Sequence, residues 1–243
     1  GHHWGCFDYS QQEPRLTVHY SVLTHQDGAE EAAIEYHDDD ADFHQIVADM
    51  ANISRKEAKL INLGLSYGMG KEKLTKQLGI SPEEAELLFD QYHKRVPFVR
   101  GLRDSAARQG ANRGYVNTIL GRKCRFNLYE PIDRRAIPYP IDKAMEEYGG
   151  QLKRAYTYKA MNRLIQGSAA DMTKQAMLDL HKEGIIAHTQ VHDELNISVK
   201  NIQECEKVME IMRDCVKLKV PNKVDGEIGK SWGHVVDYRE YFK

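Results

Sequence analysis

Residues 189–199 have the sequence Thr-Gln-Val-His-Asp-Glu-Leu-Asn-Ile-Ser-Val. Apolar side chains alternate with polar ones on both sides of His192-Asp193, at Val191, Leu195, Ile197 and Val199. A period of two is typical of a half-buried β-hairpin, with the central polar pair at its tip. The pattern therefore predicts an antiparallel hairpin that carries a carboxylate, Asp193, at the turn.

Two more segments favour strands, and a long helical stretch separates them. Trp4–Tyr9 is an apolar run that leads into a helix, with Ser10 as the expected cap and Glu13 three residues on. Val220–Ile228 is a third strand candidate. Between them, residues 43–113 have leucine, alanine and charged residues at helical spacing. The predicted fold class is α+β: a small antiparallel sheet that carries a large helical insertion.

Helix starts are well marked in the insertion. Ser54–Glu57 and Ser81–Glu84 both have the Ser-x-x-Glu spacing of a capping box, and the second has proline at its first helical position. Glycines at 64, 68 and 70 are expected to weaken and then end the helix that begins at Arg55. Residues 115–121 favour a short extended segment, and residues 144–182 are expected to be mostly helical.

Composition excludes several classes of protein. The chain has 243 residues, 41% apolar and 29% charged, which suits one medium domain or two small ones with a real core. No apolar run is long enough for a membrane helix, so we expect a cytoplasmic protein without membrane contact. The four cysteines, which contain no CxxC pair, are expected to be free thiols: Cys6, Cys124, Cys205 and Cys215.

The net charge of −2 conceals a segregation along the chain. Residues 24–49 contain nine acidic side chains and no Lys or Arg, and residues 37–42 are expected to form an exposed loop. Residues 94–125 contain nine basic side chains against Asp104 alone. The basic segment suits a surface that follows a phosphate backbone or, equally, a solvated helix face, and charge alone leaves both open.

Two aspartates are candidate metal ligands. Asp8 ends one predicted strand and Asp193 lies at the hairpin tip. Carboxylates from two strands of one sheet can converge on a pair of Mg²⁺ ions, as phosphoryl transfer requires. Taken alone, an Asp at a strand end is more often a turn or cap residue than a metal ligand, and a metal-dependent nuclease would also use such a pair.

The helix that begins at Arg55 has a graded face. Arg55, Lys59, Leu63 and Tyr67 follow at intervals of four, so they share one broad side of a helix. Two cations, an aliphatic and an aromatic residue would suit the phosphates, sugar and base of a nucleotide in turn. The alternative is an amphipathic helix with two exposed cations.

Four motifs occur in one order along the chain. They are Asp8-Tyr9-Ser10-Gln11-Gln12-Glu13-Pro14-Arg15, Arg55-x3-Lys59-x7-Tyr67-Gly68, Gln166-Gly167-Ser168-Ala169-Ala170-Asp171 and Val191-His192-Asp193-Glu194-Leu195. In this order they resemble the motifs of family A DNA polymerases, the DNA polymerase I group, and look closest to the phage members. The resemblance covers nearly the whole chain, from about residue 7 to about residue 232.

The resemblance implies roles in catalysis. Asp8 and Asp193 would hold two Mg²⁺ ions, with the Tyr9 carbonyl as a third ligand. Arg55 and Lys59 would grip the incoming triphosphate, and Lys59 would protonate the departing pyrophosphate. His44 would also touch the phosphates.

The remaining implied roles concern substrate selection and DNA. Glu13 would fill the space that a ribose 2′-hydroxyl needs, and Leu63, where many relatives have an aromatic residue, would lie beside the sugar. Tyr67 would stack at the templating position. The expected DNA contacts are Gln11, Asn162, Gln166 and His192 in the minor groove, together with Arg15 and Arg122.

The resemblance implies a DNA-templated DNA polymerase that uses primer-template DNA and dNTPs. It divides the chain into palm (1–42), fingers (43–113) and palm (114–243). Family members have a thumb ahead of the position of Asp8, so we expect a fragment, or one half of a split enzyme whose N-terminal half supplies thumb and exonuclease in trans. The rivals are a non-catalytic partner of a second chain and a single-subunit RNA polymerase, against which Glu13 argues.

Overall fold

The computed structural model describes residues 2–37, 42–66 and 71–243. By packing, the chain divides into two compact units, Gly1–Leu16 with Ser168–Lys243 and Thr17–Gly167. The helices α1 (Gln12–Leu23) and α9 (Ala160–Lys182) contain the two points at which the chain passes between the units. Each unit is described by itself below.

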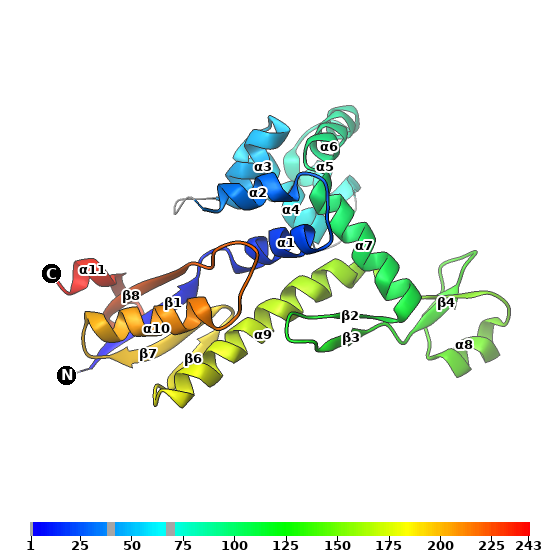
Figure 1. Ribbon diagram of the computed structural model, residues 1–243. Coiled ribbons are helices and arrows are strands. Elements are labelled where there is room, and N and C mark those ends of the chain that lie inside the picture. The colour runs from blue at the N-terminus through cyan, green and yellow to red at the C-terminus, as the bar shows by residue number, and fades with distance from the viewer. Residues whose placement is uncertain (1, 38–41, 67–70) are drawn as a thin grey trace. The chain divides into compact units, whose positions relative to one another are not determined.

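The smaller unit is a five-stranded antiparallel sheet with helices (Figure 1). Its spatial order is β6 (Ala187–Val191), β7 (Glu194–Val199), β1 (His3–Tyr9), β8 (Val224–Ser231) and β9 (His234–Asp237). The helices α10 (Ile202–Asp214) and α11 (Tyr238–Tyr241) complete it. The predicted hairpin at 189–199 is confirmed as β6 and β7, and the expected strand at 220–228 begins at Val224 and continues to Ser231.

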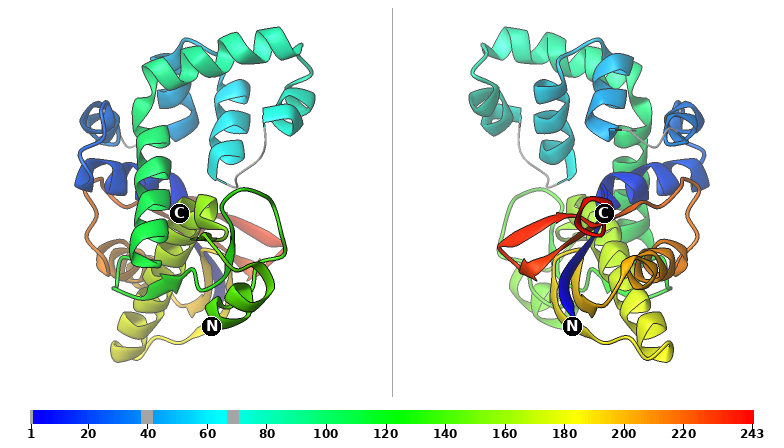
Figure 2. Two further views of the ribbon diagram at one scale, coloured as in Figure 1. Left: turned by 90° about the vertical axis from the view of Figure 1, so that its right-hand side faces the viewer. Right: turned by 90° about the vertical axis from the view of Figure 1, so that its left-hand side faces the viewer.

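The sheet has one apolar and one polar face because successive side chains alternate. Phe7 and Tyr9 of β1 lie on the side of α10, where Phe7, Leu195 and Ile228 are fully buried. Figure 2 shows α10 lying along this side of the strands. Asp8 lies on the opposite, polar face.

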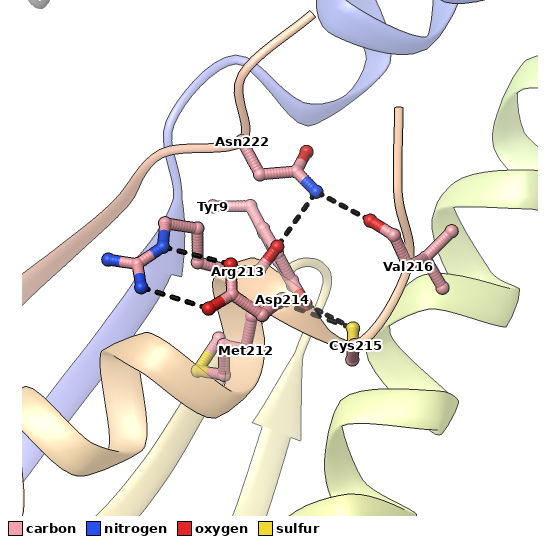
Figure 3. Close-up of polar contacts among 7 residues, drawn as sticks. All are labelled: Tyr9, Met212, Arg213, Asp214, Cys215, Val216 and Asn222. Atoms are coloured by element: carbon pink, nitrogen blue, oxygen red, sulfur yellow. Dashed lines mark hydrogen bonds and ion pairs between the residues drawn. The ribbon is translucent and has the colours of Figure 1, made fainter. Parts of the chain in front are cut away.

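The C-terminal turn of α10 is fastened to β1 and to the connection before β8 (Figure 3). The Tyr9 hydroxyl donates to the Met212 carbonyl at 2.6 Å and contacts Cys215 Sγ at 3.3 Å. Asn222 Nδ2 donates to the carbonyls of Arg213 and Val216, both at 3.0 Å. These contacts satisfy carbonyls that the helix end would leave without a partner.

The larger unit consists mainly of helices. They are α2 (Ala29–Glu35), α3 (Phe43–Ala51), α4 (Arg55–Ser66), α5 (Lys71–Leu78), α6 (Pro82–Arg95), α7 (Pro97–Arg113) and α8 (Ile141–Tyr148). Two small antiparallel ladders pair β2 (Tyr115–Asn117) with β3 (Lys123–Arg125) and β4 (Tyr129–Pro131) with β5 (Leu152–Arg154), and a 3₁₀ turn η1 (Thr157–Lys159) precedes α9.

Local signals explain where several of these helices begin. Ser54 and Glu57 exchange backbone and side-chain hydrogen bonds, and Ser81 and Glu84 do the same, so both predicted capping boxes are confirmed. The chain changes direction sharply between α6 and α7 (Figure 2). Pro97 at the start of α7 lacks the N–H that would continue α6.

One expectation about a helix boundary is wrong. The first helix begins at Gln12, because Gln11 adopts a positive φ of 55° and its carbonyl accepts the Arg15 amide, so Ser10 is not the residue that caps it. Residues 144–182 are mostly helical, as expected, but in two helices. Gly149 and Gly150, both with positive φ, end α8, and β5 and η1 come before α9.

The α+β prediction is confirmed, and all four cysteines are free. Sequence reasoning did not anticipate α2, which lies inside the acidic stretch, or α10. Of the expected acidic loop, residues 38–41 lie outside the described part, and Asp42 caps α3. None of the described helices is both long enough and apolar enough to cross a bilayer.

Removal of the Tyr9 hydroxyl tests the attachment of β1 to α10. We expect Tyr9→Phe to lower the free energy of unfolding by about 1–2 kcal/mol, because the buried Met212 carbonyl loses its side-chain donor. Tyr148→Phe is the control, since that hydroxyl bonds the Ile137 carbonyl at an exposed position. Urea unfolding measures both, and equal losses in the two variants would contradict the account.

Candidate active site

Strand register gathers acidic residues around Asp8. Asp8 pairs with Glu194 of β7 on one side and with Asp225 of β8 on the other. Residues directly opposite in adjacent antiparallel strands have side chains on the same face. The polar face of the sheet therefore has three neighbouring carboxylates in one row.

Asp193 reaches the same place from the β6–β7 turn. His192, at the first turn position, has a positive φ of 60°, and Gln190 Nε2 donates to its carbonyl at 2.9 Å. The Asp193 side chain is 32% exposed, whereas that of His192 is 83% exposed. The turn directs Asp193 toward the sheet and leaves the imidazole of His192 open to a ligand.

The carboxyl groups of Asp8 and Asp193 lie close enough to interact. Partial desolvation, followed by the negative charges of Asp193 and Glu194, raises the pKa of Asp8 from 3.8 to about 7. Neighbouring carboxylates repel each other, so Asp8 holds its proton to higher pH unless a cation lies between them. The structure thus brings together the two predicted metal ligands, Asp8 and Asp193.

Glu13 borders this pair from the first turn of α1. Burial raises the pKa of its carboxyl, the nearby His192 lowers it, and Asp193 raises it. Glu13 is therefore close enough to the hairpin tip for His192 and Asp193 to act on its carboxyl electrostatically. Its neighbour Gln12 is buried, with Nε2 3.3 Å from both the Ala169 carbonyl and Thr173 Oγ1, which fixes the start of α1 against α9.

The donor set around Asp8 suits a hard divalent cation. Carboxylate oxygens are the ligands that Mg²⁺ prefers, and it is usually held by one or two of them together with water and substrate oxygens. No group of three or more His, Cys, Asp or Glu side chains in the described part of the chain converges as a closed metal cluster. An open pair of carboxylates fits Mg²⁺ shared with substrate. The Tyr9 side chain is buried, so this residue can contribute its carbonyl alone.

In the larger unit, Arg55 is held by an acidic partner. Its Nη2 and Nε lie 2.6 and 3.0 Å from Asp42 Oδ2. Burial acts to raise the pKa of Asp42, but hydrogen bonds from Arg55 and from the amides of Gln45 and His44 outweigh it and hold that pKa below its usual value. Asp42 therefore partners the guanidinium of Arg55 in this structure.

His44 is positioned by a buried chain of hydrogen bonds. Its Nδ1 lies 3.2 Å from Asn62 Nδ2, and the hydroxyl of the buried Tyr92 donates to Asn62 Oδ1. Burial lowers the pKa of His44. The charge of Asp42 acts to raise it, and the charges of Arg55 and Lys59 lower it further. Arg55, Lys59 and His44 therefore form one cluster, in which Lys59 is exposed.

Two further predicted residues fall outside what the structure describes. The side chain of Leu63 and the whole of Tyr67 lie outside the described part of the chain. Their expected positions at the sugar and at the templating base stay predictions.

The expected DNA contacts differ in their surroundings. Asn162 and Gln166 are one turn apart on α9, so they share a face, and Gln166 is exposed. Gln11 is half-buried at the turn before α1. Arg122 is exposed, and its guanidinium donates to the Gly167 carbonyl at 2.9 Å.

Arg15 has structural partners. It is 3% exposed, and its guanidinium donates to the carbonyls of Ser10 at 2.9 Å and Pro221 at 2.6 Å. A buried guanidinium bonded to the backbone holds the chain around β1 and β8 in place. The expected contact of Arg15 with DNA stays a prediction, and the burial of its side chain does not favour it.

Sequence reasoning did not identify several members of these clusters, namely Asp42, Asn62, Tyr92, Glu194 as a neighbour of Asp8, and Asp225. The strand register that aligns Asp225 with Asp8 joins residues more than 200 positions apart, and no local pattern signals it. The capping position of Asp42 before α3 was the one readable signal.

The comparisons with known proteins agree on one family. The model of "DNA polymerase family A" matches residues 1–234. A DNA-directed DNA polymerase of Pseudomonas phage M6 is 39% identical over 96% of this chain, and DNA polymerase I of Pseudomonas aeruginosa is 32% identical over 93%. The chain spans 39% and 24% of the lengths of these relatives.

A solved structure is also similar. The POL domain of Pol1 from M. smegmatis, in complex with DNA primer-template and dNTP, superposes with a TM-score of 0.73 and 31% identity. The match covers 95% of this chain and 40% of that one. With a family model that matches nearly all of its residues, the chain belongs to DNA polymerase family A.

Proposed function

We propose that this chain forms the palm and fingers of a DNA-templated DNA polymerase, which transfers a nucleotidyl group from a dNTP to a primer 3′-hydroxyl. The observation that carries the proposal is the proximity of the Asp8 and Asp193 carboxyl groups in a member of this family. In this proposal residues 1–42 and 114–243 are palm and residues 43–113 are fingers.

Asp8 and Asp193 would hold two Mg²⁺ ions, with the Tyr9 carbonyl as an additional ligand. When bound, the ions activate the 3′-hydroxyl and neutralise charge on the transferred phosphate. To serve as a ligand, Asp8 would have to release the proton that its raised pKa retains, because carboxylates bind metal ions in the deprotonated form.

The cluster on α3 and α4 would bind the triphosphate. Arg55 would exchange Asp42 for a phosphate oxygen, an anion for an anion, so its guanidinium stays paired throughout. His44, with its lowered pKa, would meet the phosphates as a neutral ring. Lys59 would donate a proton from Nζ to the pyrophosphate as it leaves.

The remaining residues would select the substrate and align the DNA. Glu13, beside the hairpin tip, would occupy the space of a ribose 2′-hydroxyl. Asn162, Gln166, His192 and Gln11 would contact minor-groove acceptors, which are alike for every correct base pair. Arg122 would contact the backbone, Leu63 would lie beside the sugar, and Tyr67 would lie at the templating base.

The partners would be primer-template DNA and dNTPs. The phage and bacterial relatives are more than twice as long as the matched region, so a thumb-containing N-terminal half acting in trans is the further partner that we propose to test.

Substitution of either carboxylate tests the catalytic assignment. We expect Asp8→Asn and Asp193→Asn each to reduce primer extension by at least about 1,000-fold, because the metal ligands are lost. The assay contains Mg²⁺ and dNTPs, with the chain alone and mixed with a thumb-containing half of a relative. Glu210→Gln on the exposed side of α10 is the control and should retain activity. Substantial extension by either aspartate variant would overturn the assignment.

The raised pKa of Asp8 predicts a pH dependence of stability without metal. Between pH 4 and about 7 the folded chain keeps a proton that the unfolded chain has released, so the free energy of unfolding falls as the pH rises across this range. In EDTA, Asp8→Asn should reduce this fall, as measured by urea unfolding at several pH values. Identical pH profiles for both proteins would show that the proton kept by the folded chain is not on Asp8.

Two substitutions of Glu13 test whether its size or its charge excludes the ribose 2′-hydroxyl. We expect Glu13→Ala to increase ribonucleotide incorporation relative to deoxyribonucleotide incorporation by about tenfold or more, whereas Glu13→Gln, which keeps the bulk, should change it little. Single-nucleotide incorporation with dNTP and rNTP measures the ratio. A wild-type preference for rNTP would favour the RNA polymerase reading, and an unchanged ratio in Glu13→Ala would remove the steric role.

A further inference from the structure

The larger unit contains a half-open pocket of about 190 Å³ that no part of the proposed polymerase site uses. Its lining residues come from the C-terminal end of α1, the part of α7 from Leu102 to Arg113, the strand β2 and the first turns of α9. Leucine side chains from α1, α7 and α9 form its apolar part. The volume is below that of pockets for drug-sized ligands, so it suits one ring system.

The polar lining suits a heterocycle with hydrogen-bonding edges. The lining residues include two tyrosines, Tyr20 and Tyr115, two residues with amide side chains, Gln109 and Asn117, and Ser105. Amide side chains pair with base edges, and aromatic rings stack on bases of any identity. None of the described lining residues is Asp, Glu, His or Cys, which argues against a metal ion as the ligand.

One cation lines the pocket, and a second lies over the ring of one of the lining tyrosines. Arg113, at the C-terminal end of α7, lines it and is exposed. Lys123 Nζ lies 4.5 Å from the centroid of the Tyr115 ring. Within the described residues Arg113 takes part in no ion pair, so its guanidinium is open to an anion. A phosphate beside the ring would meet positive charge without a competing carboxylate in the lining.

We propose that this pocket binds a nucleoside monophosphate unit, either as a free nucleotide or as one unpaired residue of a single DNA strand. The base enters between Tyr20 and Tyr115, its edge meets Gln109 or Asn117, and the phosphate stays at the mouth beside Arg113. The inference is independent of the polymerase proposal, because none of its residues is assigned to that reaction.

Calorimetric titration with deoxyadenosine 5′-monophosphate in EDTA tests the site. The background variant Arg55→Gln/Lys59→Gln removes the proposed triphosphate cluster. We expect Arg113→Gln and Asn117→Leu each to weaken binding at least about fivefold, and Ser105→Phe to abolish it by filling the pocket. Arg108→Gln, an exposed arginine on the same helix, is the matched control and should bind unchanged. Equal affinities in all four variants would overturn the site, and the two lining variants decide it if Ser105→Phe does not fold.

Parallel titrations with parts of the nucleotide test whether both the base and the phosphate contribute to binding. Deoxyribose 5-phosphate and deoxyadenosine should each bind at least about fivefold more weakly than the nucleotide, and equal binding by either would contradict the assignment of base or phosphate. A trinucleotide that binds more tightly identifies a strand as the source, and equal affinity identifies the free nucleotide. Loss of binding only when Arg55 and Lys59 are changed would place the nucleotide at the proposed polymerase site and refute this pocket, whatever the result of primer extension.

Discussion

Repulsion between two carboxylates at the end of one sheet is the constraint on which the candidate active site depends. The pairing of β1 with β7 and β8 places Asp8 between Glu194 and Asp225, and the β6–β7 turn adds Asp193. Such a group of acids destabilises the fold unless a proton or a cation separates them. The raised pKa of Asp8 reflects this repulsion, which protonation of Asp8 relieves. Under the proposed function, a divalent cation would relieve it instead and supply the chemistry of phosphoryl transfer.

In the larger unit, positive side chains are paired with an acidic partner. Arg55 is paired with Asp42, and a buried Tyr92–Asn62 contact positions His44 beside them. Because Asp42 accepts the hydrogen bonds of Arg55, this cluster is ordered before any ligand binds. Under the proposed function, an incoming phosphate would exchange one anionic partner of Arg55 for another, which costs less than desolvation of an isolated arginine.

The sequence predicted elements whose signals are local. The hairpin around His192, the capping boxes at Ser54 and Ser81, and the order of the motifs needed a few neighbouring residues each. The partners of Asp8 on β8 and of Arg55 before α3 depend on long-range register and packing, which no short pattern encodes. Arg15 shows that a motif does not fix the surroundings of its residues. The motif suggests a DNA contact, whereas the guanidinium is buried and bonded to backbone carbonyls.

Cation binding at the carboxyl pair tests the central claim most directly. Mn²⁺, in place of Mg²⁺, is titrated calorimetrically at pH 6 in two buffers that differ in ionisation enthalpy. The account predicts binding with release of close to one proton, since Asp8 is largely protonated at that pH, and loss of this binding in Asp8→Asn and Asp193→Asn. Binding without proton release, or binding that survives both substitutions, would contradict it.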